Sequence, residues 1–436
     1  MCTRKSLLNA GFLVMLSCLL APLLVACGGS SNSSTSTGPV TLTFWSWVPN
    51  LQSEVDLFEN SHPNIKIKLE NAGQSAAEYT KLETSLKANS GAPDVVQIEL
   101  SHLPEFILTN KLVDLTQYGA NDVKNDYVSW VWSQVTQGGK VYAIPQDSGP
   151  MGMLYRKDIF AQYHLSVPKT WAEFAQDAET LHKANPKIYL TDFPTNDPAQ
   201  FEAFAAQAGS RPFKVSGTTV SVAVNDAGAL KIANYWNPLI NDKSVATAPD
   251  FTNDWYAGLG NGTYATWLTA GWGPVFLSGV AAKSAGKWAV APLPQWNAGD
   301  TVSANWGGST DAVTTQSQHP KEAAEFATWL NHDPASTLML AQKQFLFPVL
   351  TSTLDNSAID TPSAFFGGQK INDVFSAASK QIDTTYQWSP FESYVDNELQ
   401  NQVAAAASGK YTLAQGLQNL QTSTVTYAKN QGFTVK

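Results

Sequence analysis

The sequence contains very little cysteine. Its three cysteines, Cys2, Cys18 and Cys27, all fall at the N-terminal end, and the rest of the 436-residue chain has none. A chain of this length can bury a large hydrophobic core and does not need covalent cross-links. The sequence therefore excludes an internal disulfide framework for everything that follows residue 27.

Charged residues are also scarce, at 14% of the chain, and the formal net charge is −9. A moderately acidic surface argues against nucleic acids and anionic lipid headgroups as ligands. We therefore expect no nucleic-acid partner. Tryptophan is abundant by contrast: fourteen residues, all beyond residue 40. Many indole rings with few charges suit a protein that stacks aromatic faces against neutral ligands, although most of these rings are expected in the core.

The first 26 residues have the pattern of a secretory signal. Arg4 and Lys5 precede an apolar run over residues 7–24, and small residues follow before Cys27. A charged start, an apolar centre and a small-residue exit are typical of a signal peptide. Its removal takes Arg4 and Lys5 away, so that the formal net charge changes from −9 to −11. No later stretch reaches eighteen apolar residues, and we expect no second membrane span.

The segment Leu24-Val25-Ala26-Cys27 resembles a bacterial lipobox. This resemblance implies that the chain is cut before Cys27 and that this thiol is acylated, with palmitate as one such acyl group. Residues 27–39 then form the lipidated cysteine and a Gly/Ser-rich tether. The alternative is an uncleaved anchor helix, because the apolar run approaches spanning length. Both alternatives place the remaining chain outside the cytoplasm, on the outer face of the cell membrane.

The hydrophobic pattern beyond residue 40 alternates between strands and helices. We expect strands over residues 40–45, 65–69 and 94–98, and helices over residues 52–60, 77–88 and 102–110. This order indicates βαβ units and an α/β fold with a mainly parallel sheet. Ligands of such sheets bind at the carboxyl ends of the strands. Trp45, Trp47 and Glu99 are therefore expected near one rim. One indole should face a ligand and the other should pack, and the sequence does not say which.

The second half of the chain is more helical and has no internal repeat. Residues 321–331 form a clear amphipathic helix, with Ala324, Phe326, Ala327 and Leu330 on one face. Searches for reactive motifs find none: the six histidines are scattered without metal-ligand spacing, and no nucleophile elbow or phosphate loop occurs. We expect no enzyme activity, no cofactor and no metal.

Seven short segments, in this order and spacing, resemble the extracytoplasmic sugar-binding proteins of ABC importers, the family 1 solute-binding proteins that include maltose-binding protein. They are Ala92-Pro93-Asp94-Val95-Val96, Gly139-Lys140-Val141-Tyr142-Ala143-Ile144-Pro145, Leu154-Tyr155-Arg156-Lys157-Asp158-Ile159-Phe160, Pro168-Lys169-Thr170-Trp171-Ala172-Glu173-Phe174, Gly262-Thr263-Tyr264-Ala265-Thr266, Val290-Ala291-Pro292-Leu293-Pro294 and Ala405-Ala406-Ala407-Ser408-Gly409-Lys410. Arg156 departs from the family, which usually has Asn there.

The resemblance implies a two-lobe periplasmic-binding-protein-like fold of type II, with crossing hinge strands. The expected first lobe is residues 40–114 plus 295–346, and the expected second lobe is residues 115–294 plus 347–436. The implied function is capture of a mono- or oligosaccharide in the interlobe cleft by a monomer, and delivery to the permease subunits of an ABC importer.

Several ligand-binding residues follow from the resemblance. Glu99 would accept sugar hydroxyl hydrogens at a strand end. Asp147 follows a turn that opens onto the cleft in the family, and Trp272 matches a stacking position. The segment Trp306-Gly307-Gly308 resembles a Gly-Gly strand that lets hydroxyls approach the backbone. Trp388 lies where relatives present another aromatic side chain.

Two other functions stay open on the residues alone. The chain could be a lipid-anchored glycoside hydrolase, with Glu99 and Asp147 as its paired carboxylates. It could also be a binding protein that reports sugar to a membrane receptor. A polyol or glycerol phosphate could replace the sugar as ligand, although the acidic balance disfavours anions.

Overall fold

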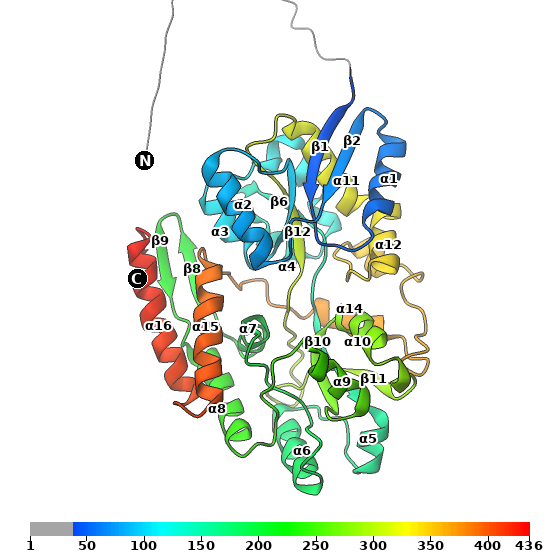
Figure 1. Ribbon diagram of the computed structural model, residues 1–436, viewed down its shortest axis with the longest axis vertical. Coiled ribbons are helices and arrows are strands. Elements are labelled where there is room, and N and C mark those ends of the chain that lie inside the picture. The colour runs from blue at the N-terminus through cyan, green and yellow to red at the C-terminus, as the bar shows by residue number, and fades with distance from the viewer. Residues whose placement is uncertain (1–37) are drawn as a thin grey trace, which may run out of the picture. The chain divides into compact units, whose positions relative to one another are not determined.

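The computed structural model describes residues 38–436 (Figure 1). The predicted signal peptide, Cys27 and most of the predicted tether lie outside the described residues. Within residues 38–436, no helix combines the length and the hydropathy that crossing a bilayer requires.

The first sheet has the strand order β2-β1-β3-β12-β6. Its strands are β1 (Val40–Trp45), β2 (Ile65–Glu70), β3 (Val95–Glu99), β6 (Ala143–Pro145) and β12 (Ser309–Val313). Strand β1 pairs in parallel with both β2 and β3, while β12 runs antiparallel to β3 and β6. The three expected strands of the N-terminal segment are thus confirmed, and so is their parallel pairing.

Helices pack around this sheet and share its core. They are α1 (Gln52–Ser61), α2 (Ala76–Ala88), α3 (Leu103–Leu108), α4 (Ser129–Gln134), α11 (Pro320–His332) and α12 (Pro334–Lys343), with 3-10 turns η1 (Leu115–Tyr118) and η2 (Ala120–Asp126). In the core, Phe326 meets Phe44 and Phe58 edge-on at 5.2 and 5.0 Å between ring centroids. The expected amphipathic helix is α11, and its apolar face is buried as predicted.

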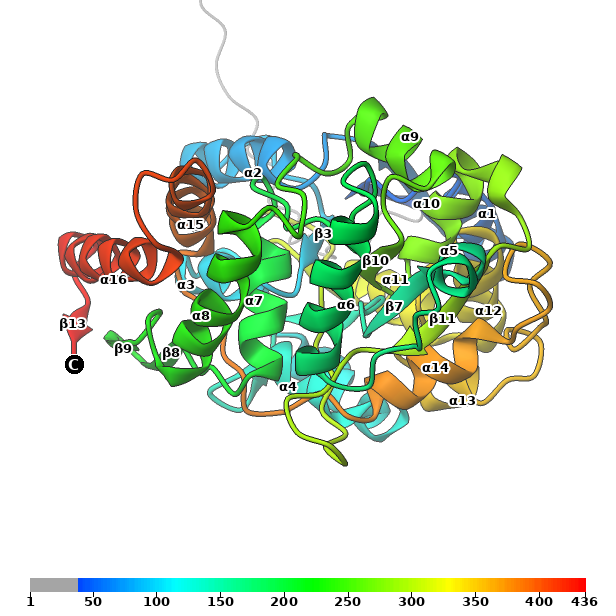
Figure 2. The same ribbon diagram turned by 90° about the horizontal axis from the view of Figure 1, so that it is seen from below.

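The second sheet is antiparallel and smaller. Its order is β10-β7-β11, formed by β7 (Met151–Arg156), β10 (Thr266–Ala270) and β11 (Trp288–Pro292). Its helices are α5 (Lys157–Gln162), α6 (Trp171–Ala184), α7 (Pro198–Gln207), α8 (Ala227–Asn241), α9 (Asn253–Asn261), α10 (Gly273–Val280), η3 (Ala282–Ser284), α13 (Thr351–Leu354), α14 (Ile371–Ser379), α15 (Glu392–Ala407) and α16 (Leu413–Asn430). Figure 2 shows α15 and α16 beside each other, at the edge next to α8.

Short strands complete the fold. A three-stranded sheet joins β8 (Phe213–Ser216), β9 (Thr219–Val222) and the C-terminal β13 (Thr434–Val435), and β4 (Thr136–Gln137) pairs with β5 (Lys140–Val141). Among the strands of residues 38–436, parallel pairing is therefore confined to β1, β2 and β3 and to the short pair β9–β13, and the other strand pairs are antiparallel.

The two sheets define two lobes. Here the first lobe means residues 40–145 plus 309–346, and the second lobe means residues 151–304 plus 351–436. The first crossing lies at residues 146–150 rather than at the expected residue 115, because β6 is hydrogen-bonded into the first sheet and Ala143 and Ile144 are fully buried in its core. The return lies at residues 305–308 rather than 295, because Ala304 still packs in the second core.

Three chain segments cross between the lobes and bind one another. They are residues 146–150, 305–308 and 347–350, and we call them the crossing segments. The N–H of Ser148 donates to the carbonyl of Phe347 at 3.1 Å, and the N–H of Trp306 donates to the carbonyl of Gly149 at 2.8 Å. A side chain at Gly149 would clash with the Trp306 carbonyl, at 1.8 Å from the added Cβ. The segments are therefore packed in direct contact.

Candidate functional site

The carboxyl ends of β1 and β3 meet at one rim, as the sequence predicts. Gln97 of β3 accepts hydrogen bonds from the Ser46 hydroxyl at 2.7 Å and from the Trp47 N–H at 3.1 Å. Ser46 and Gln97 are both buried. This pair fixes the direction in which the chain leaves β1, and so positions the tryptophans on either side of Ser46.

Trp45 and Trp47 have different neighbours. The indole N–H of Trp45 donates to Glu70 of the edge strand β2 at 3.2 Å. Trp47 instead lies edge-on to Tyr79, at 6.4 Å between ring centroids. Tyr79 in turn donates to Glu99 at 2.9 Å. Trp47 is therefore the indole on the side of Glu99, while Trp45 faces the sheet edge.

Glu99 is half-buried and held by hydroxyl groups. Its carboxylate accepts from the Ser75 hydroxyl at 3.0 Å and from the Tyr79 hydroxyl at 2.9 Å, both through Oε2. Oε1 has no hydrogen bond among the described residues. One oxygen is thus committed to the protein, which leaves the other as a possible acceptor for a ligand.

Asp147 lies in the first crossing segment and is almost fully buried. Its Oδ1 accepts from the N–H of Ser309 at 2.7 Å. Burial, together with the charges of Glu99 and Asp311, raises the pKa of Asp147 to about 7 in spite of that hydrogen bond. Asp147 therefore links the first crossing segment to β12. This is a structural role in addition to the predicted ligand contact.

Gly307 and Gly308 are explained by backbone geometry. Their φ angles are +83° and +96°, in the left-handed region that favours glycine. A Cβ on Gly308 would lie 2.9 Å from both the Asp147 carbonyl oxygen and the Ser148 Cα. The Gly308 carbonyl also accepts from the Leu100 N–H at 2.9 Å. The backbone at Gly308 is therefore in close contact with neighbouring backbone, and part of this contact is with another crossing segment.

Trp272 is the centre of an aromatic cluster in the second lobe. Its indole N–H donates to the Trp306 carbonyl at 3.0 Å, and the two rings meet edge-on at 4.9 Å. Trp306 is buried, whereas Phe251 and Phe276 beside Trp272 are exposed to 39% and 48%. The sequence analysis did not single out these two phenylalanines. Exposed rings around a half-buried indole form a surface on which a sugar ring could stack.

Trp388 lies elsewhere. It is buried, meets Tyr386 edge-on at 4.8 Å, and lines a cavity with Trp130, Gln134 and Asn305. The indole N–H of Trp130 has no hydrogen-bond partner among the described residues. This cavity includes Asn305 of a crossing segment.

Carboxylates gather where α7 and α15 meet. Oxygen atoms of Glu202, Glu392 and Asp396 lie within 4.8 Å of one another. Burial and the neighbouring charges raise the pKa of Glu202 and of Glu392 well above the ordinary value, so both are accommodated by protonation. Glu392 and Asp396 are four residues apart on α15, but the sequence could not predict that Glu202 joins them, because only the packing of α7 on α15 brings it there.

Acidic side chains outnumber basic ones in this region. Asp197 at the start of α7 is also affected by Glu99 and Asp396, and its pKa is raised to about 7, mainly by burial. The cation nearest to these groups is His102, whose Nε2 lies 3.4 Å from Asp396. Such a surface disfavours anionic ligands and favours ligands rich in hydroxyl donors.

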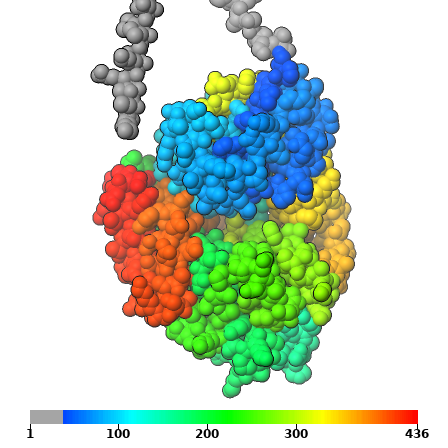
Figure 3. Space-filling view, in the orientation of Figure 1, coloured from blue at the N-terminus to red at the C-terminus, as the bar shows by residue number. Residues whose placement is uncertain are grey.

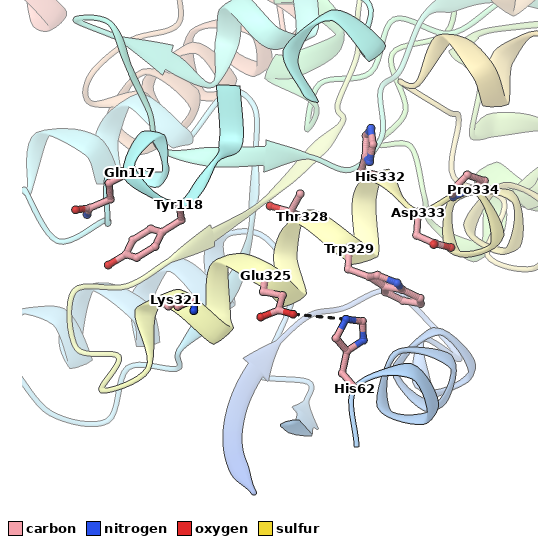
Figure 4. Close-up of a pocket in the computed structure, with 10 residues that line it drawn as sticks. All are labelled: His62, Gln117, Tyr118, Lys321, Glu325, Thr328, Trp329, His332, Asp333 and Pro334. Atoms are coloured by element: carbon pink, nitrogen blue, oxygen red, sulfur yellow. Dashed lines mark ion pairs between the residues drawn. The ribbon is translucent and has the colours of Figure 1, made fainter. Parts of the chain in front are cut away.

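A separate groove opens on the outer face of the first lobe (Figure 4). It is lined by His62, Gln117, Tyr118, Lys321, Glu325, Thr328, Trp329, His332, Asp333 and Pro334. His62 precedes the amino end of β2, and its Nε2 is 3.6 Å from Glu325. Trp329 packs edge-on against the core residue Phe58 at 5.3 Å. This groove is therefore at the opposite strand ends from Trp47 and Glu99.

The space-filling view shows a groove between the surface of the first lobe, in blue, and that of the second lobe, in green (Figure 3). The rim residues Trp47 and Glu99 belong to the first lobe and the Trp272 cluster to the second. The predicted site residues thus fall into three groups: the rim, the crossing segments with Asp147 and Gly308, and the aromatic cluster. Trp45 and Trp388 lie outside them.

Comparison with known proteins identifies relatives along most of the chain. A family model described as bacterial extracellular solute-binding protein matches residues 45–335. An arabinooligosaccharide-binding protein of Bacillus subtilis is 28% identical over 327 residues, which cover 72% of this chain and 74% of the relative.

Two solved structures are similar to the whole described region. One is an ABC-transporter-associated binding protein of B. animalis subsp. lactis in complex with β-1,6-galactobiose, with a TM-score of 0.81 and 31% identity over 92% of this chain and 100% of that chain. The other is the galacto-N-biose/lacto-N-biose I-binding protein of Bifidobacterium longum in complex with lacto-N-biose, with a TM-score of 0.82 and 29% identity over 92% of this chain and 99% of that chain.

The buried carboxyl groups make stability depend on pH. Burial raises the pKa of both Asp147 and Asp311 from the ordinary value of 3.8 to about 7. A group with a raised folded-state pKa contributes stability that is lost as the pH rises, here between about 4 and 7. The free energy of unfolding should therefore be lower at pH 8 than at pH 5, by about 1–4 kcal/mol. Chemical denaturation at the two pH values measures it.

The variant Asp311→Asn should reduce this difference, because the amide cannot ionise and its oxygen can still accept from Gln146 and Asn331. Equal stability of the wild-type protein at pH 5 and pH 8 would contradict the assignment.

Proposed function

The chain belongs to the family of bacterial extracellular solute-binding proteins, and on this premise we propose that it captures a mono- or oligosaccharide between its two lobes and delivers it to the permease of an ABC importer. The observation that carries the proposal is similarity to sugar-bound binding proteins at about 30% identity over 92% of this chain. An extracellular location follows from the family.

The contacts of the site support a sugar as the ligand. The half-buried Trp272 with the exposed rings of Phe251 and Phe276 offers apolar faces, over which the C–H surface of a pyranose can pack. Glu99 across the groove offers a carboxylate oxygen to hydroxyl groups. We assign Trp47 to the ligand side and Trp45 to packing at the sheet edge.

Delivery depends on a change between open and closed lobes. The crossing segments are the only links of backbone between the lobes within residues 38–436, so they are the place where rotation occurs. A ligand that contacts both lobes binds the closed form more tightly and shifts the balance toward it. The permease then recognises a surface to which both lobes contribute.

A lipid on Cys27 completes the proposal. The lipobox-like segment precedes Gly28 and the Ser-rich stretch that leads to β1. Attachment to the membrane raises the concentration of the binding protein near its permease without changing its intrinsic affinity for sugar.

A ligand screen tests the function directly. β-1,6-Galactobiose, lacto-N-biose and arabinooligosaccharides, together with monosaccharides, are incubated with the purified protein, and the midpoint of thermal unfolding is measured. At least one sugar should raise the midpoint and be recovered intact. Release of new reducing ends, abolished in Glu99→Gln, would instead favour a glycoside hydrolase.

Removal of the central indole should weaken binding. Trp272→Ala removes the stacking surface, and we expect a loss of about 1–3 kcal/mol of binding free energy in calorimetry. Trp329→Ala is the matched control, because Trp329 is also a half-buried indole but lines the outer groove of the first lobe. Equal affinity of Trp272→Ala and wild type, with both proteins folded, would remove Trp272 from the site.

The anchor has its own test. In Cys27→Ala the acylated thiol is absent, so the protein should leave the membrane fraction and appear in the soluble fraction after cell fractionation. Trp329→Ala serves again as the control and should stay with the membrane. Retention of Cys27→Ala in the membrane would favour the uncleaved anchor helix.

A further inference from the structure

Two polar contacts join α3 of the first lobe to α15 of the second lobe. The N–H and the hydroxyl of Ser393 both donate to Oε2 of Glu105, at 3.2 and 2.9 Å. Beside them, Nε2 of His102 lies 3.4 Å from Oδ2 of Asp396. Figures 1 and 2 both show α3 next to α15. Phe106 of α3 packs in the first core and Val395 of α15 in the second, so each partner belongs firmly to its own lobe.

His102 is buried at this contact, with 7% of its surface exposed. The groups that face it come from both lobes. From the first lobe they are Glu105 on α3, Glu99 on β3 and the ring of Tyr79 on α2; from the second lobe they are Asp396 on α15 and Glu202 on α7. The first-lobe groups are on the same lobe as His102 and would stay with it if the lobes moved, whereas the second-lobe groups would separate from it if the contact between α3 and α15 opened.

We propose that the His102–Asp396 and Glu105–Ser393 contacts form a latch that holds the lobes closed, and that closing the latch takes up a proton on His102. The proposal rests on the proposed function, because it concerns how ligand capture is regulated. His102 and Glu105 act here as positioning residues: they favour the closed form without touching the sugar.

The charge of His102 depends on closure for an electrostatic reason. Burial by itself disfavours the charged imidazole, but the carboxylates of Asp396 and Glu105 outweigh burial and raise the pKa of His102 from 6.5 to about 10. When the lobes open, Asp396 moves away while Glu105 stays, so the pKa of His102 falls toward the ordinary value. At a pH between the two values, closure therefore binds a proton.

Proton uptake on closure determines how the affinity for ligand changes with pH. A proton bound on closure means that the affinity for ligand falls as the pH rises from about 7 to 10, by at most tenfold per pH unit for one proton. Below this range both forms are charged, and His102 adds no slope. Burial alone would raise the pKa of Glu105, but the ion pair with His102 at 3.6 Å and the hydrogen bonds from Ser393 outweigh burial and lower it, so the latch survives mild acid.

Protons on the neighbouring acids should not cancel this uptake. Glu202 and Glu392 are 8% and 1% exposed and are buried where α7 packs on α15, both within the second lobe. The packing of α7 on α15, which contributes to this burial, lies within the second lobe and does not depend on lobe closure.

Calorimetry in two buffers with different ionisation enthalpies measures the protons taken up per sugar bound. The probe is β-1,6-galactobiose, with lacto-N-biose and arabinooligosaccharides as alternatives, at pH 6, 8 and 9. Wild type should take up close to one proton at pH 8 and lose about three- to tenfold in affinity from pH 8 to pH 9. His102→Gln should take up none and show a flat affinity.

His332→Gln is the matched control. His332 also pairs with a carboxylate, Asp126 at 2.8 Å, but both residues belong to the first lobe. Its proton uptake should equal that of wild type. Glu105→Gln keeps the shape of the side chain and weakens the bonds to Ser393, and should lower the affinity about 3- to 30-fold while the complex with saturating sugar stays as compact as wild type.

The outcomes separate this inference from the function. Saturable sugar binding with equal proton uptake in wild type and His102→Gln would overturn the latch and leave the function standing. Failure of every sugar to bind would overturn the function. The latch is then still tested without ligand: the radius of gyration of the unliganded protein should increase from pH 7 to pH 9.5 in wild type and not in His102→Gln, and an identical change in both would overturn the latch.

Discussion

The arrangement of the molecule depends on hydrogen bonds among the three crossing segments. The N–H of Ser148 donates to the carbonyl of Phe347, and the N–H of Trp306 donates to the carbonyl of Gly149. Neighbouring crossing segments are thus hydrogen-bonded to each other as strands are. Asp147 adds its carboxylate to the N–H of Ser309, where β12 begins. Because these bonds join backbone groups of buried segments, they fix where the lobes meet. Every residue of the groove is positioned relative to them.

In the proposed site, two kinds of surface lie on the two sides of the groove. The first lobe supplies acceptors and hydroxyls, organised by Tyr79 and Glu99, while the second lobe supplies aromatic rings around Trp272. Neither surface alone would enclose a sugar, because stacking leaves the equatorial hydroxyls unbonded and hydrogen bonding leaves the C–H faces exposed. Closure satisfies both requirements at once. The buried carboxyl groups of Asp147 and Asp311 lower stability at neutral pH, whereas other carboxylates, those of Asp396, Glu105 and Glu99, raise the pKa of His102.

Local patterns predicted the elements well and the lobe boundaries less well. The strict alternation of Ile65 to Leu69 identified β2, and Ala324 to Leu330 identified the buried face of α11. The change in pattern at Leu115 was misread as a change of lobe. Residues 115–135 are short helices over the first core, and only the pairing of β6 with β12 shows this. That pairing is between residues about 165 positions apart along the chain, which no local pattern reveals.

The sequence predicted part of the candidate site. The rim followed from strand ends, because parallel strands place their carboxyl ends together, and the structure shows that Gln97 joins them. Trp272, Gly307 and Gly308 came from resemblance to the family. Phe276 lies four residues after Trp272 in α10, a spacing that could have revealed it, whereas Phe251 lies on a bend before α9. The carboxyl cluster of Glu202, Glu392 and Asp396 was missed because only the packing of α7 on α15 brings Glu202 to the other two.

The position of β1 has a mechanical consequence. β1 lies inside the first sheet, with β2 on one side along six residue pairs and β3 on the other. Any pull through an N-terminal anchor would enter the fold at Val40 and load both pairs in shear, along the strand direction, so that many hydrogen bonds resist together instead of opening one at a time. Only the first lobe would carry that load. The second lobe would be attached only through the crossing segments and would not bear the tension. Its rotation toward the first lobe would therefore need no work against the anchor.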